Sequence, residues 1–461
     1  MKSIFFAALV LITAISACRA QTAPAGTRDV ATGLDTPWEI LWGPDNYIWM
    51  TERYGRISRI NPETGELIAL ATLNDVFEDG ERGLMGMALH PDFSVNPYVY
   101  TVYTYRDGSG NTLIRIIRLT FTGSSLGSPS VIMDSIKGYW NHDGSRLWID
   151  ESLKLWATIG DAASPNLAQQ LDSRNGKILR MNLDGSIPDD NPFPGSYVWS
   201  MGHRNPQGLV FANGRIYSSE HGPDKDDEVN IIEKGRNYGW PNVNGFCDLE
   251  SEKQFCQANN VAEPIYAWTP TLAVCGLDYY SHEKFSGWTN ALLMVSLKAG
   301  KLTVMKLDET GDKVKSVENY FNGSLGRLRD LCVSPDGRVF IATSNKDGRG
   351  TPGTQDDRII ELLPQASSTN EDNQGGINYH ISPLPAIDYI DFSFDGLTEN
   401  LILEIYSIQG ALVFSSAIRA GARDYSWDLT GKGGEKVGPG IYLARIHNNG
   451  NFIHKSIIVG N

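Results

Sequence analysis

The chain has 461 residues, 41% of them hydrophobic, and it contains 47 glycines, 19 tyrosines and 11 tryptophans. At this length we expect more than one domain, and the glycine and aromatic content favours many short strands joined by tight turns. The 40 basic and 54 acidic residues give a net charge of -14, which argues against a nucleic-acid partner.

The first twenty residues have the pattern of an export signal. Lys2 precedes an apolar run over residues 4–15, and small residues follow it. The run is too short to cross a bilayer, and no later segment is long enough. We therefore predict a signal peptide over 1–20, cleaved after Ala20, and a secreted or cell-surface protein. The stretch ISAC, ending at Cys18, also resembles a weak lipoprotein box, so acylation of Cys18 is an alternative.

Export places the cysteines in an oxidising compartment, where they tend to pair. Besides Cys18 there are four. The short separation favours a Cys247–Cys256 bridge and leaves Cys275 with Cys332. Four cysteines allow three pairings, so the connectivity stays open. A metal–thiolate site is disfavoured because no CxxC spacing occurs.

From residue 27 to residue 364 one pattern recurs: a turn, a short alternating strand, and a polar or glycine end. PDNYIWMTERYG (44–55) and SPDGRVFIATSN (334–345) are examples. Period-2 alternation interrupted by Asp-Gly and Asn-Gly turns indicates hairpins. Repeated four-strand units of roughly 40–60 residues describe a β-propeller, and this length gives about six blades. We predict an all-β fold with a six-bladed β-propeller over 27–364.

After the propeller, residues 365–380 contain almost no large apolar side chains and are predicted to be a linker. Residues 381–461 show further alternating runs, such as LILEIYSIQG and GIYLARI, that predict a small β-sandwich. No acid, base or metal cluster occurs in this part. We expect it to serve attachment, stability or export.

A propeller gathers equivalent strand ends at one mouth of its central channel, so polar residues far apart in sequence can meet there. His142 stands just before a predicted strand, and Asp161 ends the next strand pattern. A general base needs hydrogen-bond reach to its proton and a carboxylate to orient it, which fits this pair. Arg204 and Asn205 could polarise a carbonyl or an alkoxide. The alternative is that His142 is structural, as lone histidines usually are.

A second candidate site is the Gly222-Pro223 corner with the acidic residues 226–228 behind it and Asp248 further on. Hard cations such as calcium take oxygen ligands from carboxylates and from carbonyls held in tight turns. A solvated acidic turn is the alternative.

Two basic groups have the character of anion clamps: Lys298 at a strand end, and Arg327 with Arg329 on one face of an extended segment. Paired arginines bind carboxylates through two parallel hydrogen bonds. The alternative is ion pairing with the acidic residues of the chain itself.

With these residues in place, the chain resembles the soluble quinoprotein sugar dehydrogenases, six-bladed propellers that oxidise aldoses with pyrroloquinoline quinone (PQQ) and calcium. The similarity covers nearly the whole propeller in the family's order. The matching segments are GLMGMALHPDF (83–93), His142, TIGD (158–161), GKILRMNLDGSIPDDNPF (176–193), GHRNPQGL (202–209), SEHGPDKDDEVN (219–230), NYGWPNV (237–243), SLKAG (296–300) and RLRDLCVSPDG (327–337).

The resemblance implies a role for each matching residue. His142 would take the proton from the anomeric hydroxyl, Asp161 would orient it, and hydride would pass from the sugar's C1 to the quinone's C5. The backbone carbonyls of Gly222 and Pro223 would bind the calcium that holds the quinone. The implied cofactor contacts are Glu81, Gln169, Arg204, Asn205, Lys298, Arg327 and Arg329. The implied ligands of a second, structural calcium are Asp227, Glu228, Tyr238 and Asp248.

The chain departs from the family pattern at three positions. Asn141 stands where the glucose enzyme has aspartate, Arg82 replaces a glycine beside Glu81, and His221 replaces a glutamine beside the Gly-Pro corner. These changes affect substrate preference more than cofactor binding, and Arg82 is expected to narrow the mouth of the site.

The tail resembles the C-terminal sorting domain of type IX secretion in EIYSIQGALVF, GPGIYLARI and HKSIIV. This similarity implies the type IX machinery as a partner.

We therefore expect a secreted dehydrogenase that oxidises an aldose sugar and passes electrons to an external acceptor. A non-catalytic propeller that binds a glycan or a protein, and a metal-dependent lactonase, are the alternatives. Retention of His142, Asp161 and the basic residues disfavours the binder. A lactonase would need side-chain ligands converging on the channel axis. The sugar, and whether the protein is a monomer or a homodimer, stay open.

Overall fold

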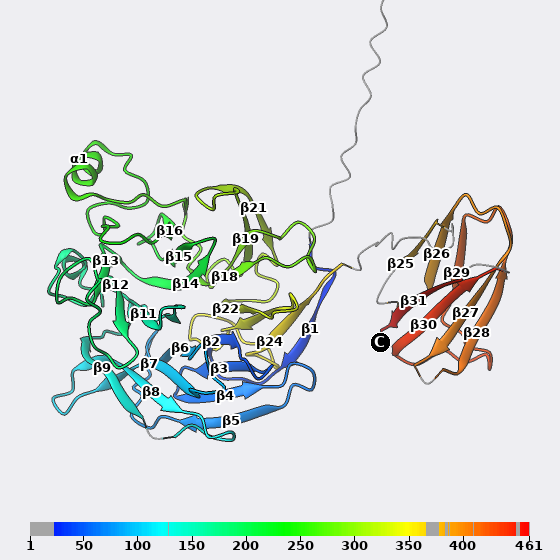
Figure 1. Cartoon of the computed structure of the whole chain (residues 1–461), viewed down its shortest axis with the longest axis horizontal. Helices are drawn as coiled ribbons and strands as arrows, with labels where there is room; N and C mark the ends of the chain where they lie inside the picture. Colours follow the sequence, from blue (N-terminus) through cyan, green and yellow to red (C-terminus); the bar gives the residue numbers. More distant parts are fainter. Residues whose placement is uncertain are drawn as a thin grey trace, which may run out of the picture. The chain divides into compact units, whose positions relative to one another are not determined.

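A computed structural model of the chain describes residues 23–127, 129–365, 378–382, 386, 388–408, 410–448 and 452–460. The predicted signal peptide, Cys18 and residues 366–377 of the predicted linker lie outside this part. The fold divides into two compact units, residues 1–365 and 366–461 (Figure 1). Neither of the two helical segments found among the described residues has the length and apolar character needed to cross a membrane.

In its described part, the first unit forms six four-stranded antiparallel sheets. Three of them are β2 (Pro37–Trp42), β3 (Ile48–Glu52), β4 (Arg56–Ile60) and β5 (Leu67–Thr72); β6 (Leu84–Leu89), β7 (Tyr98–Arg106), β8 (Thr112–Thr120) and β9 (Ser130–Lys137); and β10 (Leu147–Ile149), β11 (Lys154–Ile159), β12 (Lys177–Asn182) and β13 (Val198–Met201). The other three are β14 (Pro206–Ala212), β15 (Arg215–Glu220), β16 (Asp227–Ile231) and β17 (Tyr266–Trp268); β18 (Val274–Tyr280), β19 (Ala291–Ser296), β20 (Leu302–Leu307) and β21 (Val314–Tyr320); and β22 (Leu328–Val333), β23 (Val339–Thr343), β24 (Ile359–Leu363) and β1 (Gly26–Ala31).

The first strands of successive sheets form a closed ring. β2 contacts β6, β6 contacts β10, and the series continues through β14, β18 and β22 back to β2. The last sheet contains strands from both ends of the unit, because β1 pairs with β24 from Gly26 opposite Leu363 to Ala31 opposite Ile359. This arrangement confirms the predicted six-bladed propeller (Figure 1).

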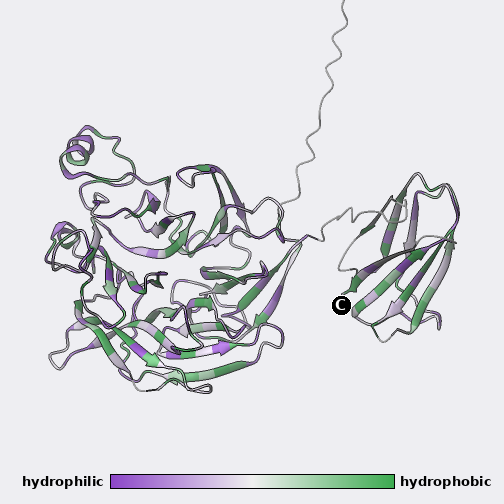
Figure 2. Cartoon of the chain, viewed as in Figure 1, coloured by the Kyte–Doolittle hydropathy of each residue, from purple (hydrophilic) through white to green (hydrophobic). Residues whose placement is uncertain are grey.

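Hydrophobic side chains fill the interfaces between neighbouring sheets. Val102 of β7 and Leu179 of β12 share one cluster, and Leu293 of β19 and Ile341 of β23 share another; all four are fully buried. Hydrophobic residues accordingly concentrate in the strands (Figure 2). Burying such a side chain contributes about 1.5–3 kcal/mol, so packing between the blades holds the ring together.

The predicted Cys247–Cys256 bridge is present, and Cys256 lies in the helix α1 (Glu250–Asn259). The predicted partnership of Cys275 with Cys332 is wrong, because both are buried free thiols. Their strands β18 and β22 are neighbours, but Cys275 packs between the fifth and sixth sheets and Cys332 between the sixth and first. Burial raises the pKa of the Cys275 thiol to about 11, so both its packing and its protonation disfavour oxidation.

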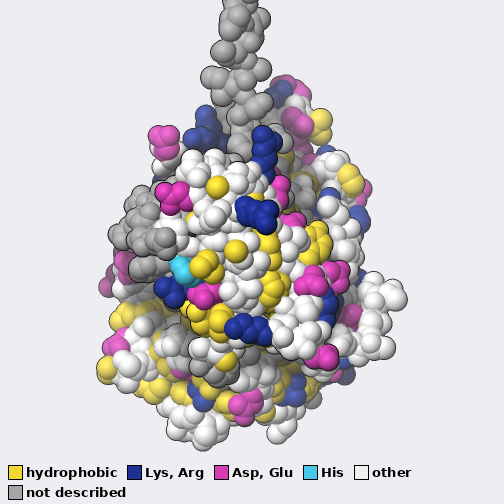
Figure 3. Space-filling view, turned by 90° about the vertical axis from the view of Figure 1, so that its right-hand side faces the viewer, with side chains coloured by type: hydrophobic (Ala, Val, Ile, Leu, Met, Phe, Trp, Pro, Cys, Tyr) yellow, Lys and Arg dark blue, Asp and Glu magenta, His cyan; other side chains and the backbone are white. Residues whose placement is uncertain are grey.

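The second unit contains two sheets in its described part. They are β25 (Asn378–Ser382), β26 (Ile390–Asp395) and β29 (Asp424–Trp427); and β27 (Leu401–Ser407), β28 (Leu412–Ile418), β30 (Gly440–His447) and β31 (Phe452–Val459). Phe392, Leu403 and Trp427 from both sheets meet in one buried core, which confirms the predicted β-sandwich. On the face seen in Figure 3, acidic and basic side chains are interspersed and hydrophobic side chains are exposed among them.

Candidate active site

A cavity of about 370 Å³ opens where the inner ends of the blades meet. Its lining residues come from strands of four sheets and from loops beside all six. Nine of the predicted site residues line it: Glu81, His142, Arg204, Gly222, Pro223, Asp227, Lys298, Arg327 and Arg329. The other six do not line it: Asp161, Gln169, Asn205, Glu228, Tyr238 and Asp248. The propeller therefore gathers residues that are more than 200 positions apart in the sequence.

His142 lies in the loop before β10, and its carbonyl accepts a hydrogen bond from the Ala162 amide at 3.0 Å. Its Nδ1 is 2.9 Å from Oδ1 of Asp161, which is fully buried just after β11. An ionised carboxylate only accepts hydrogen bonds, so Nδ1 carries the hydrogen and Nε2 is left as an acceptor. This is the protonation pattern that a general base in the cavity requires.

The Asp161 carboxylate has two further donors. The Ala163 amide donates to Oδ1 at 2.8 Å, and the indole Nε1 of Trp240 donates to Oδ2 at 2.9 Å. Asp161 therefore lies behind His142 rather than in the cavity lining. Trp240 belongs to the NYGWPNV segment, but its residue type alone gave no signal of this contact.

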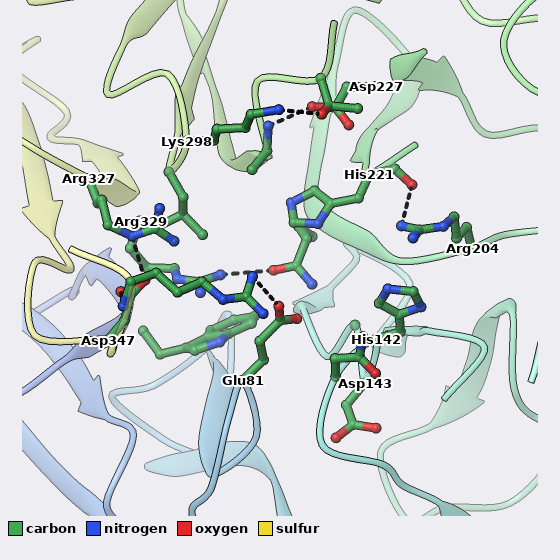
Figure 4. Close-up of a pocket in the computed structure, with 18 of the residues that line it drawn as sticks. Glu81, His142, Asp143, Arg204, His221, Asp227, Lys298, Arg327, Arg329 and Asp347 are labelled. Atoms are coloured by element: carbon green, nitrogen blue, oxygen red, sulfur yellow. Dashed lines mark hydrogen bonds and ion pairs between the residues drawn. The ribbon is translucent and has the colours of Figure 1, made fainter. Parts of the chain in front are cut away.

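Arg204 lies beside His142 in Figure 4. Its Nη1 donates to the carbonyl of His221 at 3.3 Å, and its Nε is buried without a hydrogen-bond partner among the described residues. Burial lowers the pKa of the Arg204 guanidinium. The guanidinium also lies over the ring of Trp240, 5.3 Å from the ring centre, in a cation–π contact.

Asn205 is fully buried and links the loop of His142 to the Gly-Pro corner. Its Oδ1 accepts from the Gly144 amide at 3.1 Å, and its Nδ2 lies 3.3 Å from Nδ1 of His221. Burial, reinforced by the guanidinium groups of Arg204 and Arg329, lowers the pKa of His221 to about 3. The imidazole of His221 is therefore neutral, and its Nε2 is another buried atom with no partner in the described part of the chain.

Lys298, Arg327 and Arg329 lie on the opposite side of the cavity from His142 (Figure 4). Arg329 donates from Nη1 to Gln207 at 2.9 Å, and its buried Nε has no partner among the residues described. Lys298 donates to the Thr271 hydroxyl at 3.1 Å. Of these three, Arg327 alone forms an ion pair with an acid in the described part of the chain, through Nε to Asp347 at 2.7 Å. The cluster therefore retains positive charge toward the cavity.

Two ion pairs at the site had no signal in the sequence. Asp347 pairs with Arg327, and the carboxylate of Glu81 pairs with Arg349 at 2.8 Å. Arg82, which was expected to narrow the mouth, does not line the cavity. Its guanidinium donates to Asp79 at 2.6 Å and packs on Phe77.

At the Gly-Pro corner, Asp227 holds the backbone. Its carboxylate accepts hydrogen bonds from the Gly222 amide at 2.8 Å and from the amides of Leu272 and Ala273 at 2.7 Å. The described residues include no group of three or more His, Cys, Asp or Glu side chains placed to hold a metal ion. A cation here would therefore depend on backbone carbonyls, such as those of Gly222 and Pro223.

The remaining metal candidates lie elsewhere. Glu228 follows Asp227 on β16 and accepts from the Gly245 amide at 2.8 Å; burial and the nearby Glu220 raise its pKa to about 8. The Tyr238 hydroxyl donates to the Ile231 carbonyl at 2.5 Å. Asp248 is exposed. The second calcium site stays a prediction.

Gln169, at the end of the short helix η1 (Pro165–Gln169), also lies outside the cavity lining. Its Nε2 donates to the Trp240 carbonyl at 2.6 Å, and its amide exchanges hydrogen bonds with Asn237 at 2.8 and 3.1 Å. The structure thus places Gln169 behind the loop that carries Trp240.

Comparison with known proteins gives a consistent result. Residues 34–352 match the glucose/sorbosone dehydrogenase family model, and residues 380–460 match a secretion-system C-terminal sorting domain. The chain is 33% identical over 406 residues to quinoprotein glucose dehydrogenase B of Acinetobacter calcoaceticus, covering 69% of this chain and 85% of the relative. It is 30% identical over 365 residues to aldose sugar dehydrogenase YliI of Escherichia coli, covering 75% and 97%. Among solved structures, the PQQ-bound aldose sugar dehydrogenase of Streptomyces coelicolor superposes with a TM-score of 0.64 at 32% identity, covering 74% and 99%.

Proposed function

The chain belongs to the glucose/sorbosone dehydrogenase family, and we propose that it oxidises the anomeric hydroxyl of an aldose sugar to a lactone with PQQ and calcium. One observation carries this proposal: the cavity that holds His142 also holds buried guanidinium nitrogens of Arg204 and Arg329 that have no hydrogen-bond partner among the described residues. Two of the relatives described above are sugar dehydrogenases of the quinoprotein or PQQ-bound type.

The residues of the cavity fit PQQ chemically. The cofactor carries three carboxylates, and charge-assisted hydrogen bonds from guanidinium groups suit such an anion. Lys298, Arg327 and Arg329 would hold the carboxylates, and the carbonyls of Gly222 and Pro223 would hold calcium. When bound, PQQ supplies the two-electron acceptor for sugar oxidation, and calcium polarises it.

The side chains of the protein would remove the proton of the sugar's C1 hydroxyl. His142 would accept the proton of the C1 hydroxyl at Nε2, because Asp161 keeps the other ring nitrogen protonated. The buried Asp161 carboxylate would stabilise the imidazolium that forms. Arg204, beside His142, would stabilise negative charge that develops on the sugar oxygen.

The test is dye-linked aldose oxidation by the purified chain, reconstituted with PQQ and calcium, alongside an equilibrium titration of PQQ binding. His142→Ala should lower kcat by about 10²–10⁴-fold, the usual contribution of a general base, and should retain PQQ binding. His282→Ala is the matched control, since His282 lies in the fifth blade outside the cavity lining, and its ring Nδ1 accepts a hydrogen bond from the nearby Lys284 amide. Calcium chelation should weaken PQQ binding in every variant.

Two outcomes would refute parts of the proposal. If PQQ binds and no aldose in a broad panel reacts, the chain is a binding propeller rather than this enzyme. If PQQ does not bind at all, the cofactor assignment is wrong.

The sorting domain at residues 380–460 supports export or a cell-surface location. We infer further that the type IX machinery recognises this domain and that the enzyme passes its electrons to an external acceptor.

A further inference from the structure

Trp240 contacts two charged side chains: Asp161, which lies behind His142, and Arg204, which lines the cavity. Its indole Nε1 donates to Oδ2 of Asp161 at 2.9 Å, while His142 and the Ala163 amide occupy Oδ1. The face of the same indole ring carries the guanidinium of Arg204, 5.3 Å from the ring centre. Trp240 does not itself line the cavity.

The indole hydrogen bond fixes how the Asp161 carboxylate is turned. With donors on both oxygens the carboxylate cannot rotate about its terminal bond without losing a hydrogen bond, and hydrogen bonds to a charged group are stronger than those between neutral groups. A carboxylate held in this way keeps His142 in a single tautomer and ring orientation. The cation–π contact holds Arg204 by a second, independent interaction.

The loop that carries Trp240 is itself held at several points. The Trp240 amide donates to the Gly202 carbonyl at 3.0 Å, and the Trp240 carbonyl accepts from Nε2 of Gln169 at 2.6 Å. Asn237 accepts from the Gly239 amide at 2.9 Å and pairs with the Gln169 side chain. A side chain at Gly202 would collide with Asn237, because an added Cβ would lie 2.1 Å from its Oδ1. The indole is therefore held by a rigid backbone.

We propose that Trp240 is a positioning residue for proton removal: it orients Asp161, and through it His142, and the face of its ring holds Arg204. The expected effect on kcat rests on the proposed function. The orientation of Asp161 and His142 by Trp240 does not. Gln169 and Asn237 contribute indirectly, because their hydrogen bonds hold the loop that carries Trp240.

The kinetic test uses Trp240→Phe, which keeps an aromatic face for Arg204 and removes the indole donor along with one ring of the side chain. We expect kcat to fall about tenfold or more, as loss of one charge-assisted hydrogen bond implies, with KM and PQQ affinity changed less than about twofold. In an Asp161→Asn background the same substitution should change kcat less than about twofold, because Trp240 is proposed to act on His142 through the Asp161 carboxylate, which this background lacks.

The matched control is Trp156→Phe. Trp156 donates from Nε1 to Asp150 at 2.9 Å, the same type of bond, in the third blade and away from the cavity. This variant should keep kcat within about twofold of wild type. An equal kcat loss in both variants, or a Trp240→Phe loss that is undiminished in the Asp161→Asn background, would overturn the positioning role.

A readout that needs no turnover is the tautomer of His142 in the cofactor-free protein, followed by NMR of the chain labelled at its eight histidines and assigned through His142→Ala. Wild type should show hydrogen on Nδ1, and Trp240→Phe should give a mixture of tautomers. If wild type oxidises no sugar, the proposed function fails, and this spectrum alone decides the inference: an unchanged His142 signal in Trp240→Phe overturns it.

Discussion

Replacing Arg146 with methionine tests how buried charge is balanced next to the cavity. Arg146 Nη1 forms ion pairs with Glu39 and, at 3.0 Å, with Asp330; the three side chains are only 3–8% exposed. Nε of Arg146 donates to the backbone carbonyl of Gln207 at 3.0 Å, and the side chain of Gln207 holds Arg329. Methionine preserves apolar bulk and leaves two carboxylates without their cation.

The expected loss of stability follows from this geometry. Removing one partner of a buried ion pair costs roughly 3–5 kcal/mol, a large share of the ~5–15 kcal/mol that holds a typical domain folded. Burial raises the pKa of Glu39 and of Asp330, and Arg146 opposes both shifts. Without the arginine both values rise further in the folded chain. The folded variant then binds protons more tightly than the unfolded one, so its stability increases as the pH falls.

Urea unfolding, followed by tryptophan fluorescence at about pH 8 and about pH 5, measures this dependence: the Arg146→Met deficit should be largest at the higher pH. Adding Glu39→Gln and Asp330→Asn to Arg146→Met should recover most of the loss, because no uncompensated charge remains. A deficit below about 1 kcal/mol at pH 8, or one that does not change with pH, would refute this account of the charge balance.

Two further changes test the site and the pH response. Arg329→Met should weaken PQQ binding about ten- to a hundredfold in an equilibrium titration, as loss of a charge-assisted hydrogen bond implies. Arg338 pairs with Glu361 outside the cavity, so Arg338→Met should leave the affinity unchanged. Equal effects of the two substitutions would contradict a role of Arg329 in binding the PQQ carboxylates. Burial raises the pKa of Asp278 to about 7, so the folded chain holds this proton more tightly and stability falls as the pH rises from about 4 to about 7, by at most about 4 kcal/mol. Thermal unfolding of Asp278→Asn across that range should show a flatter decline, and an unchanged slope would count against the buried carboxyl as its source.

The fold could be predicted because its signal is local and repeated. Each blade is a set of hairpins, and alternation with Asp-Gly and Asn-Gly turns marks hairpins within a short window of sequence. The pairing of Cys275 with Cys332 could not be predicted in the same way. Whether two cysteines on neighbouring strands meet depends on which side of a sheet each one faces in three dimensions, and these two face different interfaces between blades.

At the site, the sequence was a good guide to which residues meet at the cavity and a poor guide to the contacts that each of them makes. His142, Lys298 and Arg329 line the cavity as expected, because strand ends of a propeller meet at one mouth. The ion pair of Arg327 with Asp347 depends on the path of a loop after β23, for which the sequence carries no periodic signal. Gln169 was expected to touch the cofactor, whereas the structure places it against the Trp240 loop.

The pairing of β1 with β24 has a consequence for the order of events during export. The ring cannot close until β24, which ends at Leu363, has been synthesised, because its partner β1 (Gly26–Ala31) lies at the opposite end of the unit's sequence. Contacts between such distant parts of a chain form slowly. Until then the edges of the first and last blades are exposed to wrong partners. The segment that matches a secretion sorting domain begins at residue 380, shortly after β24, so it is synthesised only after the strand that completes the propeller.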